Sequence, residues 1–194
     1  MVTADDFKDY KKGFNNQYVC FEYPFLWNDI KSEEEDEFTD VVLHDRQHNS
    51  IVKISTKPCT FNTVDELKEA VEVELKENNC EIQQSAVESL EKLDIWDIFY
   101  TTEEEGLEIE QFHILKDNNL YTLELYTKNN RDPVIVNEFV KVIQSFKILK
   151  PSYKITEEGY DYEHDRQESL EELLRAAVCY TKVNCFWRFL WVLL

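Results

Sequence analysis

The hydrophobic pattern is clearest between residues 93 and 149. Branched and aromatic residues fill positions 93–100, a composition typical of a half-buried strand. The next apolar segment, 107–116, changes phase in its middle, because its first apolar residues alternate in one register and its last ones in the other. This change of phase predicts a β-bulge near Glu110 and Gln111.

A hairpin and a helix follow in the same stretch. The segment 117–119 consists of Asp and Asn, which tolerate the positive φ of a tight turn, and 121–126 alternates between apolar and polar residues. Asp132 suits the N-cap of a helix and Pro133 its first position, and apolar residues recur behind them at helical spacing. A short last strand is predicted at 146–148.

The amino-terminal half shows a similar mixture of strands and one helix. Thr63 and Glu66 form a capping box, and the apolar stripe behind them predicts a helix that ends near Asn78. The segment 82–90 alternates weakly and is interpreted as an edge strand. Further strands are predicted at 19–23, 41–43 and 51–54.

These elements predict an α+β fold, in which a largely antiparallel β-sheet is flanked by helices. The reason is that short turns join most consecutive strands, while the helices need a sheet face to cover their apolar stripes. We expect four regions along the chain. They are a mobile N-terminal arm at 1–16, a folded domain at 17–150, an acidic linker at 151–165, and an amphipathic helix with an apolar C-terminal tail at 166–194.

Four short motifs carry a resemblance to a known family. They are Phe21-Glu22-Tyr23-Pro24 followed by Trp27, the Thr63-to-Asn78 helix, Asn118-Asn119-Leu120-Tyr121-Thr122-Leu123, and Val142-Ile143-Gln144-Ser145-Phe146. With this pattern the chain resembles the PsbP-like superfamily over about residues 17 to 149. That superfamily includes an extrinsic subunit of the photosynthetic oxygen-evolving complex, a regulator of the Ran GTPase, and prokaryotic lipoproteins and secretion-effector chaperones. The resemblance implies an α/β/α sandwich and a partner-binding module, and it transfers no functional residue.

Acidic residues dominate the charge of the chain. There are 40 Asp and Glu residues against 21 Lys and Arg residues, and the formal net charge is -19. Such a field repels phosphate backbones, so we expect no nucleic-acid partner; it favours a basic protein partner or a divalent cation, or it simply maintains solubility. Five cysteines without a C-x-x-C pair, and an acidic N-terminus without an apolar signal segment, favour the cytoplasm.

Two acidic runs are the candidate partner-binding residues. Both lie in predicted loops, where their carboxylates could meet a basic partner or gather around Ca²⁺. Neither run has the D-x-D-x-D-G spacing of a calcium-binding hand, so we expect a solvated acidic face and no metal site. The runs are Glu33, Glu34, Glu35, Asp36 and Glu37, with Asp40 nearby, and Glu103, Glu104 and Glu105.

The C-terminal tail carries a dense apolar cluster. Lys182 and Arg188 interrupt it, so we expect no membrane span. A helix there could dock on the protein itself or on a second copy, giving a homodimer, and alternatively it could make a peripheral membrane contact. The candidate contact residues are Phe186, Trp187, Phe189, Leu190 and Trp191.

Catalytic chemistry has little support in the sequence. There is no phosphate-binding loop, dinucleotide fingerprint or G-x-S-x-G motif, and the chain has three glycines in all. His44, His48 and His113 could supply imidazole ligands and Cys59 a nucleophile, but their spacing is not diagnostic. We therefore expect a non-enzymatic protein-binding or accessory module without a cofactor. The alternatives are a chaperone-like holder of apolar helical segments and, last, a metal- or thiol-dependent enzyme.

Overall fold

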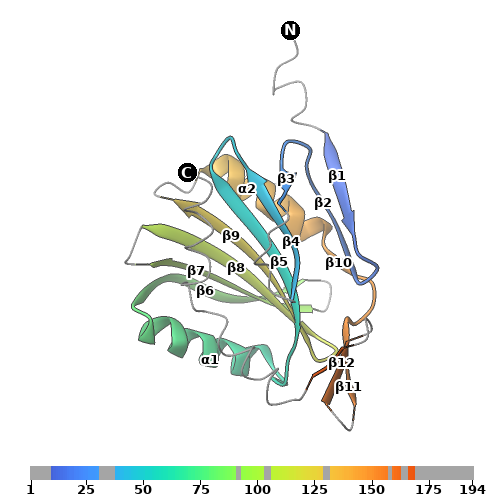
Figure 1. The fold of residues 1–194 in the computed structure, drawn as a ribbon. Helices are drawn as coiled ribbons and strands as arrows, with labels where there is room; N and C mark the ends of the chain where they lie inside the picture. The colour runs from blue at the N-terminus through green and yellow to red at the C-terminus, as the bar shows by residue number, and fades with distance from the viewer. Residues whose placement is uncertain are drawn as a thin grey trace.

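The computed structural model describes residues 10–30, 38–90, 93–102, 106–128, 132–156, 159–162 and 166–168. Within this part of the chain, a seven-stranded antiparallel sheet forms the centre. Helix α1 (Val64–Glu77) lies along one face of it, and α2 (Pro133–Ser145) covers the other face together with a small three-stranded sheet (Figure 1). The predicted α+β architecture is confirmed.

Three sheets are present among the described residues, and every strand pair is antiparallel. The main sheet has the order β3-β4-β5-β9-β8-β7-β6, and the small sheets have the orders β1-β2-β10 and β11-β12-β13. The β8–β9 hairpin turns through Asp117 and Asn118, whose φ angles of 51° and 59° match the predicted turn. The strands are β1 (Lys11–Asn15), β2 (Val19–Pro24), β3 (Asn28–Asp29), β4 (Thr39–Asp45), β5 (Ser50–Pro58), β6 (Cys80–Leu90), β7 (Leu93–Thr102), β8 (Leu107–Lys116), β9 (Asn119–Lys128), β10 (Lys147–Ile148), β11 (Tyr153–Thr156), β12 (Gly159–Tyr162) and β13 (Arg166–Glu168).

Both helices begin at the caps that the sequence predicts. The Thr63 hydroxyl accepts from the backbone N–H of Glu66 at 3.2 Å, and the Glu66 carboxylate accepts from the N–H of Asn62 at 2.9 Å. Asp132 caps α2 by accepting from the N–H of Val134 at 2.8 Å. Of the helices in the described ranges, none has the length and apolar character needed to cross a bilayer.

Each face of the main sheet buries its own core. On the α2 side, the fully buried Phe139 packs with Leu123 and the inner residues of the small β1-β2-β10 sheet. On the α1 side, Leu67 and Leu75 of the helix pack with Ile98 and its neighbours. Apolar burial on two faces accounts for the layered arrangement, because each helix hides its stripe against a different side of the same strands.

Strand β8 is regular where the sequence pattern predicted a bulge. Its register with β7 and β9 runs unbroken past Glu110. Leu107 and Ile109 belong to the α1-side core, whereas Ile114 belongs to the α2-side core and Phe112 packs against it. The phase changes because the two ends of the strand are covered on opposite faces, so the bulge prediction was wrong.

Two of the predicted regions need correction. The arm predicted at 1–16 contains β1, which pairs with β2, and Phe14 stacks on Phe21 across the pair with ring centroids 5.0 Å apart. The acidic linker predicted at 151–165 contains β11 and β12, and β13 occupies the start of the segment predicted as a helix. The remainder of that helix and the tail lies outside the described residues.

Candidate functional site

The predicted interaction residues fall outside the part of the chain that the structure describes, so their roles stay predictions. These are the acidic runs and the apolar cluster of the tail, residues 33–37, 103–105 and 186–191. Asp40, near the first run, is described, and its carboxylate accepts hydrogen bonds of 2.6 Å from the side chains of Asn16 and Thr56. These bonds tie β4 to β5 and to the turn before β2, which is a structural role.

The histidines and Cys59 are not brought together. His44 lies on β4, His48 lies in the turn after it and is bonded to Asp45, and His113 lies on β8. Burial raises the pKa of the Cys59 thiol, which disfavours the reactive thiolate. Among the residues that the structure describes, no group of three His, Cys, Asp or Glu side chains could hold a metal ion.

A row of buried polar side chains lies on the α1-side face of the sheet. We call Thr122, His113, Gln111 and Glu124 the polar row; they are 6%, 5%, 6% and 8% exposed. Thr122 Oγ1 lies 3.3 Å from His113 Nδ1, and His113 Nε2 lies 3.3 Å from Gln111 Oε1. Gln111 Nε2 donates to Glu124 at 2.6 Å. The Tyr126 hydroxyl donates to the same carboxylate at 2.9 Å.

Burial fixes the protonation state of His113. Its pKa is lowered to about 3, first because burial disfavours the charged ring and second because Lys57 lies nearby. The ring is therefore neutral at pH 7. The Gln111 amide donates to Glu124, so its oxygen is the group that faces His113, and His113 Nε2 carries the proton. The row thus forms one consistent chain of donors and acceptors, as a structural network does.

Trp96 connects the polar row to α1. Its indole stacks on His113 with ring centroids 4.7 Å apart, and its Nε1 donates to Ser85 of β6 at 3.0 Å. Ser85 in turn donates to Glu72 of α1 at 2.6 Å. The helix is therefore held against β6 and β7 by a continuous polar chain as well as by apolar contacts, which fixes where its carboxylates lie.

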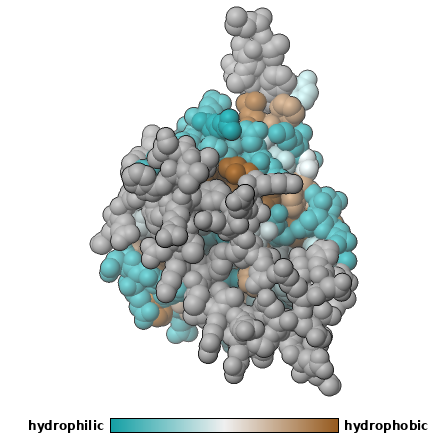
Figure 2. Space-filling view, viewed as in Figure 1, coloured by the Kyte–Doolittle hydropathy of each residue, from teal (hydrophilic) through white to brown (hydrophobic). Residues whose placement is uncertain are grey.

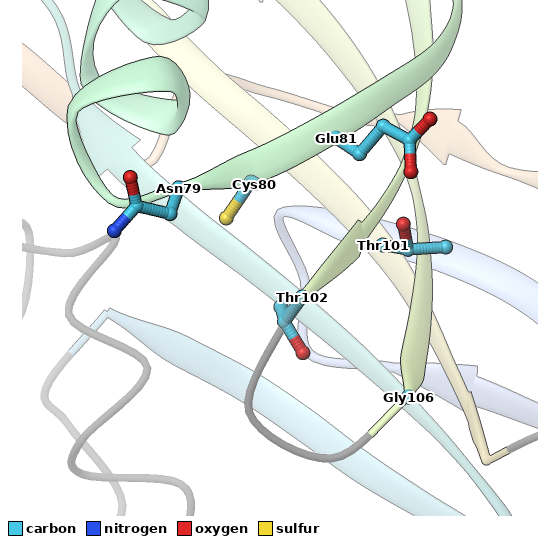
Figure 3. A pocket seen from close by; sticks show the side chains of 6 residues that line it. All are labelled: Asn79, Cys80, Glu81, Thr101, Thr102 and Gly106. Carbon is cyan, nitrogen blue, oxygen red and sulfur yellow. The ribbon is translucent and has the colours of Figure 1, made fainter.

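An open depression of about 550 Å³ lies where β6 begins and β7 ends (Figure 3). Cys80 pairs with Thr102 across the two strands, and Glu81 pairs with Thr101 beside them. The Thr102 hydroxyl is buried without a hydrogen-bond partner in the described residues, and burial raises the pKa of the Cys80 thiol. The described residues that line the depression include one carboxylate and no basic group, so these residues by themselves offer no pair for acid–base catalysis.

Carboxylates gather along α1 and the neighbouring strand β6, and in Figure 2 the visible part of this surface, at the lower left, is mainly hydrophilic. Burial raises the pKa of Glu74; the nearby Lys57 lowers it, and the neighbouring carboxylate of Glu77 raises it. Glu81 and Glu88 of β6 are exposed. We call this surface the acidic edge. Its α1 residues are Asp65, Glu66, Glu69, Glu72, Glu74 and Glu77, with Lys68 and Lys76 among them.

Sequence reasoning missed both the polar row and the acidic edge. The row had a usable signal, because Gln111 and His113 share one face of a strand whose two faces both carry apolar residues. Such a strand is buried on both sides, so its polar residues must find partners inside the protein. The acidic edge is formed by packing: the carboxylates of α1 come to lie beside β6 only because the helix packs against that strand, where Ser85 donates to Glu72.

Comparison with solved structures shows that the chain has a PsbP-like fold. The solution structure of cyanobacterial PsbP (CyanoP) from Synechocystis sp. PCC 6803 superimposes with a TM-score of 0.55 and 15% identity, over 71% of this chain and 91% of that one. A mutant form of the protein Mog1 gives a TM-score of 0.53 and 9% identity, over 72% of this chain and 96% of that one. At these identities the likeness defines the fold.

No family model and no curated protein matches the chain at the level of sequence. The predicted PsbP-like fold is thus confirmed through structure. The likeness rests on the arrangement of the strands and helices, since the sequence identities are only 15% and 9%.

Proposed function

We propose that the chain is a non-enzymatic protein-binding or accessory module whose acidic edge receives a basic protein partner. One observation carries the proposal. Six carboxylates of α1 stand against two lysines, and Glu81 and Glu88 lie on the other side of the adjoining strand β6, so carboxylates border this edge of the sheet on both sides. Surfaces of one charge sign attract partners of the opposite sign and speed their association. The resemblance described above, which implies a partner-binding module, points in the same direction.

The chemistry of the described residues also favours binding over catalysis. His113 is neutral at pH 7 and committed to the polar row, and the pKa of Cys59 is raised by burial. A general base needs a pKa near the working pH, and a thiol nucleophile needs a lowered one. Neither group therefore supports the metal- or thiol-dependent alternative. The cytoplasmic location, the homodimer and the membrane contact of the tail stay predictions.

The proposal is tested by comparing partners of the wild-type chain with those of a charge-reversed variant. Glu69→Lys with Glu77→Lys reverses two exposed carboxylates of α1 that take no part in its caps. Glu22→Lys with Glu138→Lys changes the net charge equally but lies on β2 and α2. Immobilised proteins are exposed to a cell lysate at two ionic strengths, and the captured proteins are quantified by mass spectrometry. We expect basic proteins that bind the wild type and the control but not the α1 variant. Equal capture by all three would contradict the proposal.

A further inference from the structure

The two edges of the main sheet differ in length. One edge is β3, which has two residues, and the other is β6, which has eleven. Among the described strands, β6 pairs only with β7, so its outer side presents backbone donors and acceptors along its length. Proteins usually protect such edges with lysine or other charged residues, with proline, with β-bulges or by shortening the strand, and of these devices β6 has one bulge and two carboxylates. β6 contains no lysine and no proline, and it is the longest strand in the described part of the chain.

A bulge in β6 brings two carboxylates to one face. The register with β7 shifts between Ile82 and Gln84, which adds one residue to β6. Glu81 therefore pairs with Thr101, and Glu88 pairs with Ile95. These two β7 positions are six residues apart, so Glu81 and Glu88 point to the same face of the sheet. Without the extra residue, Glu81 and Glu88 would point to opposite faces.

Within the described residues, the outer edge of β6 consequently runs between carboxylates on both sides. Glu81 and Glu88 lie on the α2 side of the strand, because Ile95 belongs to the α2-side core. On the α1 side, Ser85 bonds Glu72 of α1, so the acidic helix borders the strand there. In Figure 3 the start of this edge shows Glu81 beside Thr101, with Cys80 and Thr102 forming the adjacent pair.

We propose that β6 is a docking edge for an extended basic segment of a partner, which adds to the main sheet as an eighth strand. The inference rests on the proposed function and gives its mode of recognition. Backbone hydrogen bonds to β6 would supply affinity, and alternate side chains would supply specificity. Because Thr101 and Ile95 are six residues apart, the segment carries basic residues six positions apart, one opposite Glu81 and one opposite Glu88.

Charge decides between this occupant and a second copy of the chain. Antiparallel pairing of β6 with itself would bring Glu81, Glu88 and the α1 carboxylates of both copies together. Like charges on paired strands are destabilising, whereas a lysine or arginine opposite each carboxylate is favourable. The basic segment is therefore the occupant that the edge selects.

The test uses short synthetic peptides and the full-length protein. The reference peptide alternates threonine and valine and has lysine at its first and seventh positions; a second peptide moves one lysine so that the two are five positions apart. Binding is followed by fluorescence anisotropy of a label on the peptide. We expect the second peptide to bind about tenfold more weakly, since one of its lysines turns to the other face. Equal affinity would contradict the proposed spacing.

Backbone methylation separates strand addition from simple charge attraction. Two further peptides keep both lysines and carry N-methyl groups on one or the other alternate set of amides. In a docked strand only one set faces β6, so one peptide should lose at least about tenfold in affinity while the other stays close to the reference. If both methylated peptides bind as well as the reference peptide, strand addition is wrong. The acidic edge as a binding surface would then still be decided by the separate experiment with the charge-reversed α1 variant.

Two protein variants provide the matched control. Glu81→Lys with Glu88→Lys should abolish binding of the reference peptide, and Glu22→Lys with Glu138→Lys, which changes the net charge equally, should not. Analytical sedimentation of the protein without peptide tests whether a second copy of the chain occupies the edge instead. A dimer of the wild-type protein that the reference peptide dissociates would assign the edge to a second copy and would overturn the proposal.

Discussion

The two faces of the main sheet bury different chemistry. The α2 side hides mainly aliphatic and aromatic residues such as Phe139 and Leu123, with the carboxylates of Asp97 and Glu110 on β7 and β8, whereas the α1 side combines an apolar patch under the helix with the polar row. Apolar burial is non-directional and supplies most of the stabilisation, while each hydrogen bond of a buried network demands one geometry. We infer that the α2 side supplies most of the stability of the fold and that the α1 side fixes where α1 and its carboxylates lie.

The largest expected effect is on the α2 side. Phe139→Ala removes a fully buried ring that packs edge-on against Phe112, with centroids 5.8 Å apart. Leaving a cavity of this kind costs about 3–5 kcal/mol, a large part of a domain's stability. Urea unfolding followed by tryptophan fluorescence measures the loss. Val134→Ala on the same helix, where the side chain is 54% exposed, should change stability by about 0.5 kcal/mol or less. If both variants lost the same amount of stability, the buried face of α2 would not be what stabilises the fold.

The second prediction concerns the pH dependence that the polar row imposes. The pKa of His113 is about 3 in the folded chain, against 6.5 for an ordinary histidine. The unfolded chain therefore binds one more proton than the folded chain between these values, and stability is lost as the pH falls from about 6.5 towards 3. Through this group alone the protein should be about 2 kcal/mol less stable at pH 5 than at pH 7.

Two variants test this prediction. One removes the imidazole, and the other, the control, keeps the imidazole but disturbs the polar row. His113→Gln should reduce the stability difference between pH 7 and pH 5 by about 2 kcal/mol, because the titrating ring is gone. Thr122→Val removes a partner of His113 and should lower stability at both pH values without abolishing the difference. Urea unfolding of the three proteins at each pH decides the point. An unchanged pH difference in the histidine variant would exclude His113 as its source.

Most of the fold was predictable because local signals and tertiary packing agree. The capping residues Thr63 and Asp132, the turn at Asp117 and Asn118, and the long strands all appear where the pattern placed them. The errors arose where the hydrophobic pattern of a strand depends on which elements pack against its two faces. The phase change in β8 results from cover on two faces, and this cannot be read from one strand alone.

The candidate surfaces were less predictable than the fold. The acidic edge depends on the bulge between Ile82 and Gln84, since this one residue decides which face Glu81 takes relative to Glu88. Acidic residues are abundant throughout the sequence, so composition alone could not single these out. The candidate residues were therefore chosen from runs of consecutive carboxylates. The carboxylates of α1 and β6 are dispersed in the sequence and come together only on folding.

The smallest expected effect sharpens the comparison at the start of α1. Thr63→Ala removes the hydroxyl that accepts from Glu66, and the loss of such a cap costs about 1 kcal/mol. Thr63→Ser keeps the oxygen and should stay close to wild type. Because Glu72 and Ser85 hold the middle of the helix to the sheet, hydrogen exchange should accelerate at the first turn of α1 and not beyond it. If exchange accelerates along the whole helix, the polar chain through Trp96 does not anchor α1, and the acidic edge has no fixed geometry.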